Sequence, residues 1–270
     1  MKNLSDEEIE GRRIAFDIGS NSGSFTEFFL TKAGFDKVIA VEANPALAEF
    51  LSQKFSASSV TVVNRAVSNS TDQLIDFYVC NADGISSADE SWCTTGRFAI
   101  NPYHQWTKTQ IKTITIDDLV KQYGIPNHIK MDVEGYESVA IQGMTAAYCP
   151  IRFEWEEEKI DELEKSLNHL VSIGYHYFGI VVEHDNEFDD RPISYFDDIN
   201  KLIVSLKTDI LKQHQTNKFC PSNSVSAYYK FDYANEHGLM FWGMIWCFRE
   251  IDSHFLFRNF VKKDNKDEDT

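Results

Sequence analysis

The stretch Ile14–Glu27, IAFDIGSNSGSFTE, constrains the fold of this chain more than any other. An apolar run ends at Asp17 and leads into a polar turn with two glycines, after which apolar residues recur at helical spacing. Glycine tolerates positive φ and allows a backbone to pass close to a ligand, because it has no Cβ. Ser24 and Glu27 have the spacing of a capping box. The sequence therefore predicts a buried strand, a tight turn and a helix that begins at Ser24.

The turn itself, Asp17–Gly23, is called the glycine turn below. A strand–turn–helix of this kind leaves backbone N–H groups free at the start of the helix, where they can bind a polar ligand group. Gly19 and Gly23 stand in the pattern D-x-G-x-x-x-G, whereas dinucleotide-binding dehydrogenases have G-x-G-x-x-G. The pattern thus counts against a nicotinamide oxidoreductase. A glycine-rich turn without any ligand is the alternative.

The residues after this turn continue to alternate between strand and helix patterns. Lys37–Glu42 and Val60–Val63 are expected to be buried strands, and Asn44 followed by Pro45 is typical of the start of the helix between them. Strands separated by crossover helices form a parallel sheet. In nucleoside-binding folds of this kind, a carboxylate at the position of Glu42 accepts hydrogen bonds from ribose hydroxyls. A solvated strand end is the alternative for this residue.

A second informative stretch, Lys130–Glu137 with the sequence KMDVEGYE, is called the acidic motif below. We expect a strand to end at Asp132 and a helix to begin near the following glycine. Ligands of open α/β sheets bind beyond the carboxyl ends of the strands, so Asp17, Glu42 and Asp132 should converge on one rim. Asp132 and Glu134 could instead be a charge cluster at a helix start, where carboxylates are favoured by the helix dipole.

The remaining chain predicts a larger α/β unit with a long loop. Residues 81–103 lack periodicity and form a loop of the type that carries function. We expect a single domain over residues 1–262, an insertion of unrecognised pattern at about 185–238, and a charged, disordered tail at 263–270. Further strands are expected at Leu74–Val79, Ile111–Ile116, Ile151–Trp155, Tyr175–Val182 and Gly238–Phe248, and further helices after a cap at Asp117, over Ile160–Val171 and over Asp197–Gln213.

Composition and charge exclude several classes of partner. The chain has 26 basic and 42 acidic residues, a formal net charge of −16, so it should repel phosphate backbones and nucleic acid is not an expected partner. Its five cysteines lack C-x-x-C spacing, which predicts neither a disulfide framework nor a zinc site. The charged first residues and the lack of a long apolar run predict a cytoplasmic protein without a signal peptide or membrane span. The residues favour neither a monomer nor an oligomer.

The glycine turn and the acidic motif together resemble the FkbM family of S-adenosyl-L-methionine (SAM)-dependent methyltransferases. In that family a D-x-G-x-N-x-G turn precedes a strand end K-x-D-V-E-G-x-E, and the resemblance extends over roughly Ile14–Glu156. Ser20 departs from the alanine that the family often has. The resemblance implies an α/β fold, the Rossmann-like class I methyltransferase fold. It has a mostly parallel seven-stranded sheet with helices on both faces and an antiparallel final strand.

The same resemblance implies methyl transfer from SAM to an oxygen of a sugar, a glycan or a small metabolite. It places Glu42 on the ribose and the Ala66 backbone at the adenine. One of two acids, Asp132 or Glu134, would be the general base for the acceptor hydroxyl, and His104 in the long loop is an alternative base. The cofactor-binding residues that it implies are Asp17, Gly19, Ser20, Asn21, Gly23, Glu42 and Ala66.

Two other functions stay open for a chain with these motifs. A Mg²⁺-dependent methyltransferase would use carboxylates at neighbouring strand ends, such as Asp132 with Glu154 or Glu156, to activate the hydroxyl. We expect no bound metal, since no His or Asn after Trp155 completes an octahedral set. A non-catalytic interaction protein with a SAM-binding fold is the other possibility. The intact polar rim argues against it.

Overall fold

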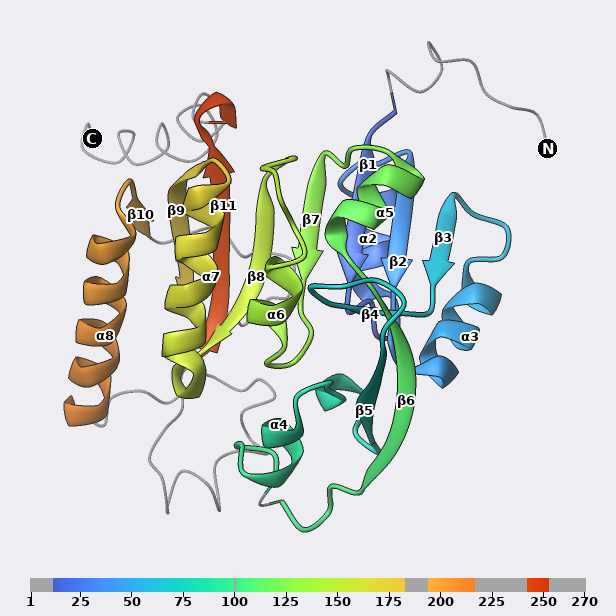
Figure 1. The fold of residues 1–270 in the computed structure, drawn as a ribbon, viewed down its shortest axis with the longest axis horizontal. Coiled ribbons are helices and arrows are strands. Elements are labelled where there is room, and N and C mark those ends of the chain that lie inside the picture. The colour runs from blue at the N-terminus through green and yellow to red at the C-terminus, as the bar shows by residue number, and fades with distance from the viewer. Residues whose placement is uncertain (1–11, 100, 183–193, 217–241, 253–270) are drawn as a thin grey trace, which may run out of the picture. The chain divides into compact units, whose positions relative to one another are not determined.

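The computed structural model describes residues 12–99, 101–182, 194–216 and 242–252 (Figure 1). The chain divides into two compact units, residues 1–149 and 150–270, and the expected single domain over 1–262 stays a prediction. The expected tail at 263–270 and the parts 185–193 and 217–238 of the expected insertion lie outside the described residues.

Four parallel strands form the centre of the first unit, in the order β7-β1-β2-β3. They are β1 (Ile14–Ile18), β2 (Lys37–Val41), β3 (Val60–Val63) and β7 (His128–Met131). Every residue of β1 and β7 is buried, as is typical of parallel strands that are covered on both faces. Helices lie on both sides of these strands (Figure 1): α2 (Ser24–Thr31), α3 (Pro45–Lys54), α5 (Ile116–Tyr123) and α6 (Glu137–Ile141).

A small second sheet of the first unit has the order β4-β6-β5. Its strands are β4 (Ala66–Val67), β5 (Leu74–Cys80) and β6 (Trp106–Ile114), of which β5 and β6 pair antiparallel. The segment between β5 and β6 contains the 3-10 helix η1 (Asp83–Ile85) and α4 (Glu90–Thr94), so the expected loop at 81–103 is partly helical. Trp92 and Phe98 are buried there with ring centroids 5.1 Å apart, which gives this segment a small core of its own.

The second unit contains four further strands, with β11 (Trp242–Arg249) antiparallel to both β8 (Ile151–Glu156) and β9 (Tyr175–Val182). The expected antiparallel final strand is therefore confirmed. The remaining elements are η2 (Glu157–Lys159), α7 (Ile160–Ser172), β10 (Ser194–Phe196), α8 (Ile199–Thr216) and η4 (Glu250–Asp252). None of the described helices has the length and apolar character that crossing a membrane requires.

The expected Rossmann-like α/β class is confirmed with a different number of strands. Among the described residues, the four parallel strands of the first unit and the four strands of the second unit make eight, where seven were expected. The additional strand is β10, which pairs antiparallel with β9 and lies inside the unrecognised insertion. Its three residues are too few to produce a periodic pattern in the sequence.

Helix α2 begins at Ser24 as expected, but the caps of the helices in the first unit follow the sequence in one case and depart from it in two. Asn44 caps α3, accepting a hydrogen bond from Ala46 N at 3.1 Å. The expected capping box at Ser24 is wrong. The residue before α2 is Gly23 in a left-handed conformation, without a side-chain cap, so Ser24 already lies in the first helical turn. Glu27 instead forms an ion pair with Lys54 at 3.2 Å.

The cap of α5 also differs from the expected one. Thr115, not Asp117, accepts the hydrogen bond from Asp118 N. Asp117 lies one residue inside the first turn, and its carboxylate accepts hydrogen bonds from Thr145 N at 3.0 Å and Tyr148 Oη at 2.9 Å. Threonine and aspartate are both good caps, so the sequence could not decide between neighbours.

Candidate functional site

The glycine turn reverses the chain through three left-handed residues: Gly19 (φ 72°), Asn21 (φ 48°) and Gly23 (φ 85°). Glycine adopts this region without steric cost, and asparagine is among the residues that tolerate it best. The N–H groups of Gly19 and Ser20 donate to the carbonyl of Val41 at 2.9 and 3.2 Å. The turn is thereby fixed to the end of β2.

Gly19 also fixes the turn to the end of β7. A Cβ at this position would lie 1.7 Å from the carbonyl oxygen of Asp132, so only glycine allows the two backbones to approach each other this closely. A Cβ at Gly23 would lie 2.7 Å from the Phe55 ring and 2.8 Å from a methyl of Leu51. The two glycines therefore permit close packing of the turn against β7 and against the side chains of Leu51 and Phe55.

Glu42 is buried at the end of β2 and holds the turn from its other side. Its carboxylate accepts hydrogen bonds from the backbone N–H groups of Asn21 and Asn44, both at 2.8 Å. Burial raises the pKa of Glu42, and the two hydrogen bonds and the charge of Lys130 oppose this in part. Each carboxylate oxygen has a second lone pair that a hydroxyl can reach. This geometry fits the predicted ribose contact, which stays a prediction.

Asp17 and Ser20 face the interior of the turn. Asp17 is fully buried and accepts a hydrogen bond from Thr26 Oγ1 at 2.6 Å. Ser20 Oγ donates to the carbonyl of Asp17 at 2.6 Å. These contacts stabilise the shape of the turn, and the predicted contact of both residues with the cofactor stays a prediction.

Ala66 lies in β4 and is buried against Phe77 and Ile111. Ala43, which directly follows the ribose candidate Glu42, packs against the same cluster. An apolar surface therefore adjoins the buried carboxylate, as an adenine ring next to a ribose would require. The adenine contact of Ala66 stays a prediction.

The acidic motif continues β7 and then turns sharply. Asp132 N donates to the carbonyl of Ile18 at 3.1 Å, and the Asp132 side chain is 31% exposed. Glu134 has φ 56° and Gly135 φ 86°. A non-glycine residue in this region costs about 1–3 kcal/mol, and such residues cluster at functional sites. The buried Ser87 Oγ donates to the carbonyl of Glu134 at 2.7 Å and holds this conformation.

The structure thus brings together most of the predicted residues and adds two to which the sequence assigned no role. The first is Lys130, whose Nζ donates to the carbonyl of Gly19 at 3.0 Å and lies 3.3 Å from Asp132 Oδ2. A lysine within a buried apolar strand was a signal for it, because a buried charge needs partners. The second is Ser87, for which a loop without periodicity gave no signal.

His104, the alternative base, makes contacts within its own segment. Its Nδ1 lies 2.9 Å from the carbonyl oxygen of Phe98, and its Nε2 lies 3.2 Å from Asn101 Nδ2. Both ring nitrogens are therefore within hydrogen-bond distance of neighbours only a few residues away. This arrangement favours a structural role for His104 in the β5–β6 segment.

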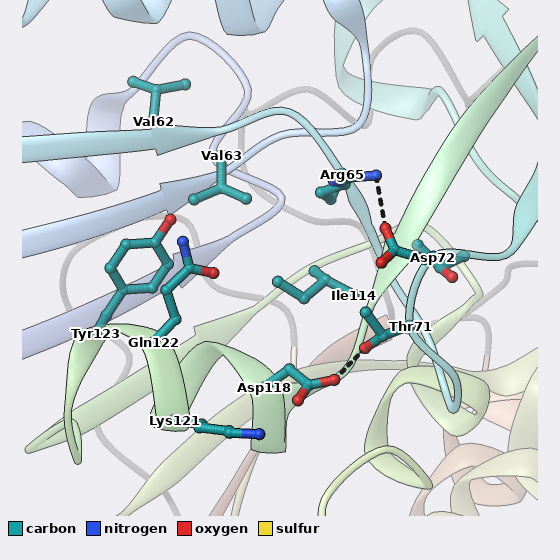
Figure 2. Close-up of a pocket in the computed structure, with 11 residues that line it drawn as sticks. Val62, Val63, Arg65, Thr71, Asp72, Ile114, Asp118, Lys121, Gln122 and Tyr123 are labelled. Carbon is teal, nitrogen blue, oxygen red and sulfur yellow. Dashed lines mark hydrogen bonds and ion pairs between the residues drawn. The ribbon is translucent and has the colours of Figure 1, made fainter.

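A separate cavity of about 610 Å³ lies beside β3 and α5 (Figure 2). Arg65 and Asp72 form an ion pair across its wall at 3.4 Å, and Thr71 donates to Asp118. The hydrogen bonds from Thr71 and then Thr115 lower the pKa of Asp118. None of the predicted site residues lines this cavity, although the lining residue Val63 accepts a hydrogen bond from Glu42 N at 3.0 Å.

One comparison with known proteins covers both motifs. A family model described as "Methyltransferase FkbM domain" matches residues 17–208. The hexuronic acid methyltransferase AglP of Haloferax volcanii is 30% identical over 149 residues, which are 54% of this chain and 56% of that protein. The match therefore spans little more than half the length of this curated relative.

Solved structures show weaker similarity. The methyltransferase FkbM from Methylobacillus flagellatus KT aligns with a TM-score of 0.44 and 18% identity, over 69% of this chain and 43% of that one. A SAM-dependent O-methyltransferase from Thermotoga maritima aligns with a TM-score of 0.37 and 10% identity, over 90% of this chain and 62% of that one. The match to the family model carries more weight than these alignments.

Proposed function

Because the chain belongs to the FkbM methyltransferase family, we propose that it transfers a methyl group from SAM to a hydroxyl oxygen of a sugar, a glycan or a small metabolite. The observation that carries this proposal is the junction of the two motifs. The Gly19 backbone packs directly against the carbonyl of Asp132, and the glycine turn is hydrogen-bonded to the buried Glu42. A cofactor turn, a ribose acceptor and a candidate base thus adjoin one another at the carboxyl ends of three neighbouring strands.

The residues at this junction fit the cofactor. The first turn of α2, which no side chain caps, offers backbone N–H groups, Glu42 offers carboxylate oxygens, and Ala43 with Ala66 offers an apolar surface. SAM brings a methyl group that is already activated on a sulfonium. The protein therefore has mainly to align donor and acceptor and to take up a proton.

In this proposal, a carboxylate of the acidic motif removes the proton from the acceptor hydroxyl. A hydroxyl becomes an effective nucleophile when a positioned general base accepts its proton, and such a base contributes about 10²- to 10⁴-fold. Asp132 is half-buried beside the rim, and Glu134 is held in a left-handed conformation two residues later. We place the base at Asp132, with Glu134 as the alternative.

A sugar is the acceptor class that we propose. Its support is the name of the Haloferax volcanii relative, a hexuronic acid methyltransferase, which shares 30% identity over the matched region. The test is transfer of radiolabelled methyl from SAM to glucuronic acid, with glucose as the neutral control. Binding of S-adenosylhomocysteine (SAH) without transfer to any hydroxyl compound would favour the non-catalytic alternative.

Chelation separates the metal-free from the Mg²⁺-dependent mechanism. Carboxylate oxygens of Asp132 and Glu137 lie within 4.8 Å of each other, a spacing that a divalent cation could bridge. Glu137 also accepts a hydrogen bond from Val133 N at 2.7 Å. We expect methyl transfer to persist in EDTA. Activity that disappears in EDTA and returns with Mg²⁺ would contradict this expectation.

Glu42→Gln should weaken SAM binding about tenfold or more, because hydrogen bonds to a charged group contribute about 1.5–3 kcal/mol. Burial raises the pKa of Glu42, so the carboxylate gains its proton at a higher pH than an exposed glutamate does. Affinity in the parent should therefore fall as the pH is lowered through this pKa. In Glu42→Gln this pH dependence should be absent.

Calorimetric titration of SAH over a pH series measures both effects. The exposed Glu49 on α3 provides the matched control, Glu49→Gln. Because the pKa of Glu42 is raised in the folded protein, protonated Glu42 contributes to stability at low pH. This contribution is lost as the pH rises through the raised pKa. An unchanged affinity in Glu42→Gln would reduce Glu42 to a residue that only holds the turn.

A further inference from the structure

Lys130 lies where the two motifs meet and has no role in the function proposed so far. It is 3% exposed in the middle of the parallel strands. A buried ammonium is unfavourable unless opposite charges and hydrogen-bond acceptors surround it. Its partners therefore indicate what the chain gains by retaining a cation at this position.

The partners of Lys130 belong to both motifs. Its Nζ donates to the carbonyl of Gly19 at 3.0 Å and lies 3.3 Å from Asp132 Oδ2 and 3.7 Å from Asp17 Oδ1. It also lies 5.2 Å from the centroid of the Phe25 ring, a cation–π distance. One side chain thus contacts the cofactor turn, the end of β1, the candidate base and the helix that follows the turn.

The charges around Lys130 exceed its own. Asp17 faces it from β1 and Asp132 from the end of β7, and its charge also acts on Glu42 at the end of β2. Asp132 in turn lies close to Glu137 of α6. Without the ammonium, these carboxylates would face one another with less opposing charge. Like charges at short range favour protonation of one of them.

We propose that Lys130 is a positioning residue that couples the cofactor turn to the candidate base. Its hydrogen bond fixes the Gly19 carbonyl, and its charge keeps Asp132 and Glu42 ionised. The ion pair with Lys130 also fixes the orientation of the Asp132 carboxylate. This role rests on the function proposed above. It assigns to one side chain the joint control of cofactor affinity and proton acceptance.

The test compares Lys130→Met with Lys130→Arg, which keeps the charge, and with Lys37→Met. Lys37 is half-buried at the start of β2, at the other end of the strands, and is the matched control. SAH affinity is measured by calorimetry over a pH series, and kcat is measured with SAM and glucuronic acid over the same series. Thermal unfolding of each variant reports on stability alone.

We expect Lys130→Met to bind SAH about tenfold or more weakly. The acid limbs of the two pH profiles, for SAH affinity and for kcat, should move to higher pH by about one unit or more. The reason is that an opposite charge at this distance lowers the pKa of a carboxylate by about that amount, and the variant lacks this charge. Lys130→Arg should keep both limbs in place, as should Lys37→Met. If Lys130→Met does not fold, Lys130→Gln, which can still donate to Gly19, undergoes the same titrations with the same expected shift.

A purely structural lysine would give a different result. The thermal midpoint of the neutral variant would fall while both acid limbs stayed where they are in the parent, and this would overturn the role of Lys130 alone. A parent protein that binds no SAH would overturn the proposed function and this role with it. The two failures are therefore distinguishable.

Discussion

Asp132→Asn should lower kcat by about 10²- to 10⁴-fold, the contribution typical of a positioned general base. The carboxamide keeps the shape of the side chain but does not accept the proton of a hydroxyl. SAM affinity should change little, because the backbone of Asp132, which the glycine turn contacts, is unaffected. Rapid-quench measurement of methyl transfer, together with calorimetry of SAH binding, separates the two quantities. The exposed Asp161 on α7 gives the matched control, Asp161→Asn.

Glu134 provides the companion experiment, because its backbone allows stability and catalysis to be separated. Glu134→Gly replaces a residue at φ 56° by the one that adopts this conformation freely. Because this relieves backbone strain, the variant should have an equal or higher thermal midpoint, whereas Glu134→Gln should leave the midpoint unchanged. A large loss of kcat in Asp132→Asn but not in these two variants assigns the base to Asp132, and the reverse pattern assigns it to Glu134. Loss of SAH binding in Asp132→Asn and Glu134→Gln alike would instead make both acids cofactor ligands.

Gly19→Val should abolish SAM binding, and Gly19→Ala should already remove most of it. A Cβ at Gly19 would lie 1.7 Å from the carbonyl oxygen of Asp132, so the turn and the end of β7 would have to separate. The backbone of the glycine turn and that of Asp132, which are proposed to lie next to the cofactor, would then both move. Calorimetry with SAH measures the loss of binding, and urea unfolding measures the accompanying loss of stability.

Gly34→Ala is the control for backbone strain in this experiment. Gly34 has the same φ of 72°, but a Cβ there would meet only the Arg13 side chain, at 3.4 Å. Gly34→Ala should therefore cost about 1–2 kcal/mol, the penalty of a left-handed conformation, and should leave SAH binding intact. Equal effects of the two alanine variants on stability and binding would contradict a special contact between Gly19 and Asp132.

The sequence predicted the framework of the site because its signals are local. The apolar run before Asp17, the Asn44–Pro45 helix start and the acids at strand ends each depend on a few adjacent residues. The parallel direction of neighbouring strands then follows from the crossover connections between them. For this reason the placement of Glu42 next to the glycine turn could be anticipated from its position at the end of β2.

Contacts between distant segments could not be read in the same way. Ser24 had the spacing of a cap, yet Gly23 takes that position, where a Cβ would clash with Leu51 and Phe55. The burial of Asp17 depends on its hydrogen bond from Thr26 and its ion pair with Lys130, a residue more than a hundred positions away. The short helices between β5 and β6 lacked a periodic pattern because they are too short to show one.

The attachment of Ser87 restricts where the β5–β6 segment can change in length. Ser87 is paired with Tyr78 through two backbone hydrogen bonds, and its hydroxyl holds the Glu134 carbonyl. A change of length between Tyr78 and Ser87 would therefore displace the acidic motif, whereas α4 lies beyond this anchor. The sequence after Ser87 in the β5–β6 segment can accordingly vary without breaking the hydrogen bond that holds the Glu134 backbone.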